Sequence, residues 1–149
     1  MDTKKKIYLQ YAAIFIFTML FGAILFIIKT SDIWRSSLPK YEYSTILPKE
    51  LLEMMNQNKE LIIIDTRIKE YFKKGHIKGA ANLPYTSMKT MTKLLKNEMS
   101  KDIVIYSEDG ERSKKICEIL TNLGFSKIKN LHGGIKNWID SGGEIVLLE

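Results

Sequence analysis

A strand pattern, a short polar loop and a helix pattern follow one another without a break over residues 103–113. The apolar run Ile103–Tyr106 is rich in β-branched residues, and helical spacing begins directly after the loop. Backbone N–H groups in such a loop point inward, and the helix dipole adds partial positive charge there. The stretch therefore predicts a cradle for an anion at the carboxyl end of a buried strand.

The rest of the chain beyond residue 40 alternates strand and helix patterns in the same way. The continuous apolar run at 61–64 is typical of a strand buried on both faces of a parallel sheet. Further strands are expected at 41–46 and 127–131, and helices at 68–74, 88–99, 112–123 and 135–139 and from Pro48 onward. Alternation of this kind predicts an α/β fold with a mostly parallel sheet and right-handed crossovers.

Helical spacing predicts which side chains face the core. In the helix at 88–99 these are Met88, Met91, Leu94 and Leu95, and in the helix at 112–123 they are Ile116, Ile119, Leu120 and Leu123. Cys117 is the only cysteine, and a lone thiol in a helix usually packs as a small apolar side chain.

A segment without charged residues occupies positions 7–28, and as a helix it would span roughly 33 Å. Tyr8, Tyr11 and Trp34 lie near its ends, as interfacial aromatics do. A cleavable signal peptide would have a shorter apolar region and a small-residue cleavage site, so an uncleaved membrane anchor is favoured. The predicted division is a basic tail at 1–6, a transmembrane helix at 7–28, a linker at 29–42 and a folded domain at 43–149. Lysines cluster before the segment, which favours a single-pass protein with a cytoplasmic N-terminus and an exported domain.

Composition excludes several classes of protein. The net charge is +6, but the basic residues are scattered and no stripe with interleaved aromatics appears, so nucleic-acid binding is not indicated. One cysteine allows neither an intramolecular disulfide nor a multi-cysteine metal site. His76 and His132 are the only histidines and lack metal-ligand spacing. No metal and no cofactor are expected.

Four motifs occur in one order along the chain. They are Asp65-x-Arg67, then Gly75-His76-Ile77-x-Gly79-Ala80-x-Asn82-x-Pro84, then Ser107-x-x-Gly110-x-Arg112-Ser113, and finally Leu131-x-Gly133-Gly134-x-x-x-Trp138-x-x-x-Gly142. Together they resemble the rhodanese (thiosulfate sulfurtransferase-like) domain over residues 43–146. The resemblance implies a doubly wound, mostly parallel sheet flanked by helices, with an active loop at its centre.

The resemblance also implies a chemistry for this loop. In the family the loop begins with a cysteine that carries a persulfide between a sulfur donor and an acceptor. The length from Ser107 to Arg112 is similar to that of the sulfur-handling form, whereas the related cell-cycle phosphatases have a loop one residue longer. The candidate site is therefore the loop itself, flanked by two charged residues: Ser107, Glu108, Asp109, Gly110, Glu111 and Arg112, with Asp65 and Arg67 beside them. The family's cysteine position is occupied by Ser107.

Serine cannot replace the cysteine chemically. A hydroxyl ionises far above a thiol's pKa of about 8.5, and it cannot carry a persulfide. A serine nucleophile needs a neighbouring base, and no motif places His76 or His132 beside the loop. The three loop acids would also repel an anionic donor, and Arg112 is expected to pair with one of them or with Asp65.

The leading hypothesis is a membrane-anchored rhodanese-like protein without cysteine-dependent sulfurtransferase activity, acting as a binding or accessory module. Its predicted partners are the bilayer, through residues 7–28, and a protein that the sequence does not identify. One alternative is a thiosulfate or persulfide sulfurtransferase that uses a different thiol. The other is an oxyanion-binding pseudo-phosphatase. Ser107 argues against the first alternative, and the loop acids argue against the second.

Overall fold

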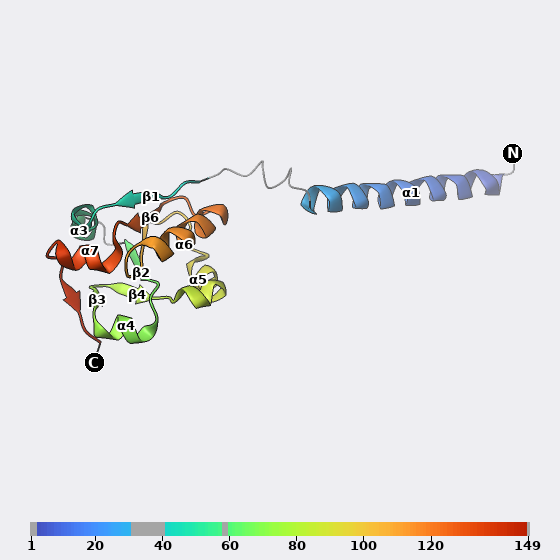
Figure 1. Ribbon diagram of the computed structural model, residues 1–149. Coiled ribbons are helices and arrows are strands. Elements are labelled where there is room, and N and C mark those ends of the chain that lie inside the picture. Colours follow the sequence, from blue (N-terminus) through green and yellow to red (C-terminus); the bar gives the residue numbers. More distant parts are fainter. Residues whose placement is uncertain (1–2, 31–40, 58–59, 149) are drawn as a thin grey trace. The chain divides into compact units, whose positions relative to one another are not determined.

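The computed structural model describes residues 3–30, 41–57 and 60–148, which fall into two compact units, Met1–Pro39 and Lys40–Glu149 (Figure 1). Most of the predicted linker at 29–42 lies outside the described residues. In the first unit the described residues form one helix, α1 (Thr3–Thr30).

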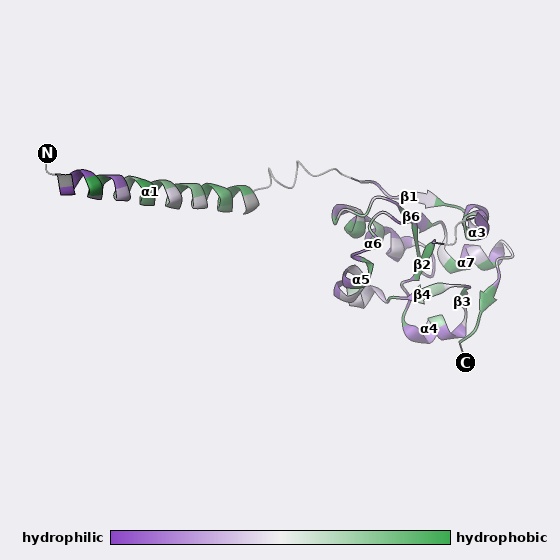
Figure 2. Cartoon of the chain, turned by 180° about the vertical axis from the view of Figure 1, so that it is seen from behind, coloured by the Kyte–Doolittle hydropathy of each residue, from purple (hydrophilic) through white to green (hydrophobic). Residues whose placement is uncertain are grey.

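Helix α1 is apolar along most of its length, and three of its lysines, Lys4, Lys5 and Lys6, lie at its N-terminal end (Figure 2). Every residue from 4 to 28 is exposed, so no part of the described chain covers the apolar side chains. Residues Lys4–Ile28 are long and apolar enough for a membrane span or a signal sequence. This confirms the predicted apolar N-terminal helix.

The second unit contains a parallel five-stranded sheet in the order β1-β6-β5-β2-β4. The strands are β1 (Ser44–Ile46), β2 (Ile62–Asp65), β4 (Ala80–Asn82), β5 (Ile103–Tyr106) and β6 (Ile128–Leu131). The helices are α3 (Pro48–Gln57), α4 (Lys69–Lys74), α5 (Met88–Leu95), α6 (Glu111–Asn122) and α7 (Gly134–Asp140), with a 3-10 turn, η1, at Tyr85–Ser87. A small antiparallel pair, β3 (His76–Ile77) and β7 (Ile145–Val146), lies outside the main sheet. The predicted α/β fold with a parallel sheet flanked by helices is confirmed.

Two hydrophobic clusters form the core, one on each face of the sheet. Ile103 and Ile105 of β5 point into the first cluster, which α5 and α6 cover, while Val104 and Tyr106 point into the second, which α3 and α7 cover. Because side chains alternate along a strand, a central strand with helices on both faces must be apolar at every position. This explains the continuous apolar run that precedes the loop.

The predicted inner faces of α5 and α6 were partly wrong. Leu94 is 60% exposed, and Ile119 and Leu123 are 45% and 51% exposed. In α6 the buried positions are Ser113, Ile116, Cys117, Leu120 and Thr121, which follow an i, i+3, i+4, i+7, i+8 pattern. The pattern begins at a polar residue, Ser113, whose burial comes from loop hydrogen bonds rather than from hydrophobicity.

Cys117 lies in the first cluster and is fully buried, as predicted. Removal from water raises the pKa of its thiol to about 12. We therefore expect the native chain to react with a water-soluble maleimide at least about a hundredfold more slowly than the urea-unfolded chain. Rapid stoichiometric labelling of the native chain would contradict this burial. The control, Cys117→Ala, should show no labelling in either state and lose about 1 kcal/mol of stability.

Candidate active loop

The loop that follows β5 folds around the hydroxyl of Ser107, a residue that is 1% exposed. Its Oγ accepts hydrogen bonds from the backbone N–H of Gly110 at 3.0 Å and of Ser113 at 3.4 Å. Gly110 has a φ of +85° and precedes the first residue of α6. The inward-pointing N–H groups that the sequence predicted are therefore present, and they converge on a side chain of the loop itself.

The hydroxyl of Ser113 completes this arrangement. Its Oγ donates to the carbonyl of Gly110 at 3.0 Å and lies 3.3 Å from the Oγ of Ser107. Since the Ser113 proton is directed to the Gly110 carbonyl, the Ser107 hydroxyl is the donor between the two side chains. Ser107 thus donates one hydrogen bond and accepts two, which uses the full capacity of a hydroxyl.

Helix α7 also forms backbone hydrogen bonds to the loop. The N–H of Ile135 donates to the carbonyl of Ser107 at 3.0 Å, and that of Lys136 donates to the carbonyl of Glu108 at 3.2 Å. Gly134 makes this approach possible, because a Cβ there would lie 2.3 Å from the Ser107 carbonyl oxygen. Gly134 of the Gly133-Gly134 motif is explained by this close contact between the loop and the start of α7.

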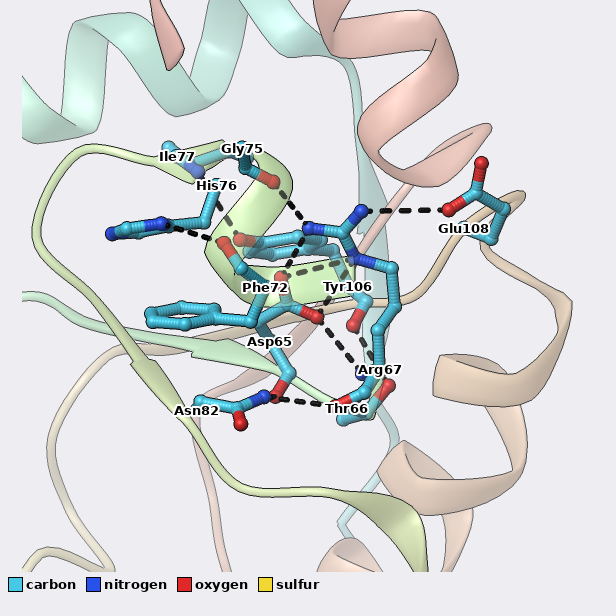
Figure 3. Close-up of polar contacts among 10 residues, drawn as sticks. All are labelled: Asp65, Thr66, Arg67, Phe72, Gly75, His76, Ile77, Asn82, Tyr106 and Glu108. Carbon is cyan, nitrogen blue, oxygen red and sulfur yellow. Dashed lines mark hydrogen bonds and ion pairs between the residues drawn. The ribbon is translucent and has the colours of Figure 1, made fainter. Parts of the chain in front are cut away.

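Asp65 and Arg67 form a buried ion pair at the carboxyl end of β2 (Figure 3). Arg67 Nη2 lies 2.7 Å from Asp65 Oδ2, and the same nitrogen donates to the carbonyl of Gly75 at 2.7 Å. Burial alone would lower the pKa of Arg67, but the hydrogen bond and charge of Asp65 raise it. The suggested pairing of Arg112 with Asp65 was therefore wrong, because Asp65 is held by its neighbour two residues along the chain.

The Asp65–Arg67 pair is joined to several elements. Asp65 Oδ1 accepts the N–H of Arg67 at 2.8 Å, and the side chain of Asn82 in β4 donates to the carbonyl of Arg67 at 2.8 Å. Tyr106 accepts the N–H of Ile77, and burial raises the pKa of its phenol (Figure 3). The pair reaches the active loop at one point, where Arg67 Nη1 lies 3.5 Å from Glu108 Oε2.

His76 does not act on the loop. Its Nδ1 lies 3.0 Å from the carbonyl of Phe72, and its ring stacks on the Phe72 ring at a centroid distance of 3.7 Å. Among the described residues, no histidine hydrogen-bonds Ser107. A general base for Ser107 is therefore missing from the part of the chain that the structure describes.

A cavity of about 370 Å³ opens over the loop. It is lined by Ser107, Glu108, Asp109, Glu111, Arg112 and Lys115. Each of its three acids has a partner in the protein: Glu108 has Arg67, Asp109 accepts the N–H of Glu111, and Glu111 pairs with Lys114. Arg112 and Lys115, in contrast, have no carboxylate within ion-pair distance among the described residues. Among the described residues, the cavity therefore has two cations without a carboxylate partner, Arg112 and Lys115, and one carboxylate without a cationic partner, Asp109.

Three residues of the site were missed from the sequence. Lys115 lies one helical turn after Arg112, so i, i+3 spacing along α6 could have found it. Ser113 was quoted in a motif, but its contact with the Ser107 hydroxyl depends on the loop conformation. Tyr85 lies under the guanidinium of Arg112, 4.2 Å from Cζ to the ring centroid, and comes from a separate element, so no sequence spacing could have indicated it.

The described residues contain no group of three His, Cys, Asp or Glu side chains arranged to hold a metal ion. The side chains that border the loop cavity are the hydroxyl of Ser107, three carboxylates and two cationic side chains.

Comparisons with known proteins show what the chain is similar to. A sulfurtransferase of Allochromatium vinosum is 29% identical over 102 residues, which are 68% of this chain and 92% of that protein. The uncharacterized protein YqhL of Bacillus subtilis is 36% identical over 85 residues, which are 56% of this chain but only 62% of the Bacillus protein. The crystal structure of a rhodanese-related protein from Thermoplasma volcanium has a TM-score of 0.63 at 28% identity, covering 71% of this chain and 100% of that one.

The family model of the rhodanese-like domain matches residues 47–141, which are more than half of the chain. This match includes β2 with Asp65 and Arg67, the loop after β5 and the start of α7 that packs against it. The chain therefore belongs to the family of proteins with a rhodanese-like domain.

Proposed function

We propose that this protein is a membrane-anchored rhodanese-like module that binds a partner and has no cysteine-dependent sulfurtransferase activity. The observation that carries the proposal is the hydrogen bonding of Ser107, which stands where the resemblance puts the family's cysteine. Its oxygen accepts two backbone N–H groups and its proton is directed to Ser113. A nucleophile needs a free lone pair and a base, and Ser107 has neither among the described residues.

The main alternative is a sulfurtransferase, which the name of the Allochromatium relative supports. Sulfur transfer from thiosulfate requires a thiolate that attacks the outer sulfur, keeps it as a persulfide and releases sulfite. The chain offers one thiol, and Cys117 is fully buried with a raised pKa. An enzymatic function would therefore need a thiol from another molecule.

A second candidate function is oxyanion binding without catalysis, as in a pseudo-phosphatase. Arg112 and Lys115 favour it, because they lack carboxylate partners among the described residues, while Glu108 and Glu111 each have a cation within ion-pair distance. Asp109 opposes it, because its carboxylate accepts only a backbone N–H and keeps its charge. Against it, the loop N–H groups of Gly110 and Ser113 already bind Ser107. An anion would thus be held at the cavity wall by side chains, without the backbone cradle.

The variant Ser107→Cys tests separately whether the loop conformation activates a thiol and whether the loop supports sulfur transfer. In Ser107→Cys, the N–H groups of Gly110 and Ser113 and the dipole of α6 should lower the thiol pKa, so alkylation should be faster than for a free cysteine. Transfer of sulfur from thiosulfate to cyanide should nevertheless remain slow because of the loop acids. Adding Asp109→Asn and Glu111→Gln should raise the rate several-fold at low salt.

The control for this series is Ser107→Ala, which should match the wild-type chain in having no thiocyanate production above background. Turnover by the wild type clearly above that control would overturn the proposal of an inactive loop. An unreactive thiol in Ser107→Cys would instead show that the loop does not activate a thiolate. A surface neutralisation away from the loop, Glu53→Gln in α3, should leave the rate of Ser107→Cys unchanged.

Anchoring is proposed to occur through residues 7–28, with the N-terminus in the cytoplasm and the domain exported. The exposed apolar surface of α1 supports a bilayer as its surroundings, because such a surface is costly in water. The lysines before the segment support the orientation.

We expect the full chain to remain in the membrane pellet after carbonate extraction and to retain residues 7–28 by mass spectrometry. A chain lacking residues 7–28 is the matched control and should be recovered in the supernatant. Protease added to spheroplasts should remove the domain. Full-length chain in the carbonate supernatant, or a mature chain cleaved after the apolar segment, would contradict the anchor, and full protection from protease would reverse the orientation.

A further inference from the structure

Strand β7 has a strand partner on one side only. It pairs with β3 in a two-stranded antiparallel sheet, and no other described strand joins that sheet. In Figure 1, β7 is the dark red strand that leads to the end marked C, and no other element of this unit lies beyond it. The outer edge of β7 is therefore unpaired among the described residues.

The residues along this edge are apolar and exposed. Ile145, Val146, Leu147 and Leu148 follow one another without a charge or a proline, and the exposed fractions of Ile145, Leu147 and Leu148 are 38%, 69% and 47%. Natural proteins usually protect an unpaired edge with charged side chains or proline, because such an edge can pair with another chain. Residues 145–148 lack this protection.

The inner side of the same segment is held firmly. A Cβ at Gly75 would lie 2.9 Å from Ile145 Cδ1 and 3.9 Å from Leu147 Cδ2, so both side chains lie over this glycine on one face of the strand. The N–H of Leu148 donates to the carbonyl of Lys73 at 3.3 Å, which extends the contact beyond the two residues of β7. The segment is thus already extended and needs little ordering to accept a further strand.

Two lysines lie at one end of this edge. Lys73 and Lys74 are the last residues of α4, and the hydrogen bond from Leu148 to the Lys73 carbonyl brings them beside the end of the segment. Lys74 also lies near the exposed ring of Tyr71, 5.7 Å from Nζ to the ring centroid. Neither lysine has a carboxylate within ion-pair distance among the described residues.

The acids nearby leave this end positive. Glu144 precedes β7 at the other end of the edge, where the register of β3 and β7, continued by one residue, sets it opposite Lys78. Glu70 lies one helical turn before Lys74 and forms no ion pair with it. Residues 69–79 and 144–148 together carry four lysines and two glutamates, and Glu149 lies outside the described residues.

We propose that the free edge of β7 pairs with an extended segment of a partner protein, which is apolar at alternate positions and acidic where it meets Lys73 and Lys74. The unpaired edge selects a polypeptide over a lipid surface, because a row of backbone N–H and C=O groups is complementary to another strand. The lysines select an acidic segment and oppose pairing of two copies of this chain, which would bring the same lysines together. The inference rests on the binding role proposed above and names its surface and its kind of partner.

Peptide binding to the full chain tests this pairing. The chain is reconstituted into phosphatidylcholine bilayers, and the probes are synthetic peptides about eight residues long, with valine at alternate positions and two aspartates at one end. For the tightest peptide, N-methylation of alternate residues on one edge should weaken binding at least about tenfold, because those N–H groups form the ladder with β7. The form methylated on the opposite edge should bind like the parent peptide.

Charge variants locate the site on the protein. Lys73→Gln together with Lys74→Gln should weaken binding about fivefold at low salt, and this difference should shrink at high salt. Lys89→Gln together with Lys93→Gln on α5 removes the same charge elsewhere and should leave binding unchanged. Peptides with two lysines in place of the aspartates should bind the unmodified chain more weakly than the acidic set.

An apolar variant tests the edge itself. Leu147→Ala should weaken binding about threefold through lost apolar contact, and the high exposure of Leu147 makes unfolding of the variant unexpected. Leu94→Ala on α5, at a leucine that is 60% exposed, is the matched control and should bind like the unmodified chain.

No binding by any peptide of the acidic set, or equal binding of both methylated forms, would overturn the inference. Self-association of the unmodified chain that Leu147→Ala abolishes would overturn it as well, because a second copy would then occupy the edge. These outcomes leave the inactive loop standing, since thiocyanate production tests that separately. A chain that binds the peptides and also produces thiocyanate would contradict the inactive loop and support the pairing at β7.

Discussion

The hydrogen bonding of one buried hydroxyl holds the centre of this domain together. Ser107 directly follows β5. Its Oγ accepts hydrogen bonds from the N–H groups of Gly110 and Ser113, which would otherwise lack partners at the start of α6. The carbonyl of the same residue receives the N–H of Ile135 in α7. One residue therefore joins a central strand and two helices, one on each face of the sheet.

The neighbouring Asp65–Arg67 ion pair is also buried with its hydrogen-bonding groups satisfied. A buried charge is costly unless it is paired and its remaining hydrogen-bonding groups are satisfied. Asp65 and Arg67 satisfy each other and the carbonyl of Gly75, and Arg67 reaches Glu108. The pair therefore fixes the turn after β2 and gives Glu108, which lines the loop cavity, a cationic neighbour. Arg112 and Lys115 border the same cavity together with Asp109 and Glu111.

The sequence by itself determined the α/β class, the parallel sheet, the apolar N-terminal helix and the position of the loop, because these depend on periodic hydrophobicity and on glycine-marked turns. It also predicted the burial of Cys117. Contacts between elements were decided only by the tertiary structure. Arg112 over Tyr85, Glu108 beside Arg67 and the hydroxyl of Ser113 beside that of Ser107 join residues from different elements or from a loop conformation that spacing does not encode. The buried faces of α5 and α6 were also decided by the tertiary structure. Apolar side chains occur on more than one side of each helix, and packing against the neighbouring strands determines which side is buried. Leu94 is exposed for that physical reason.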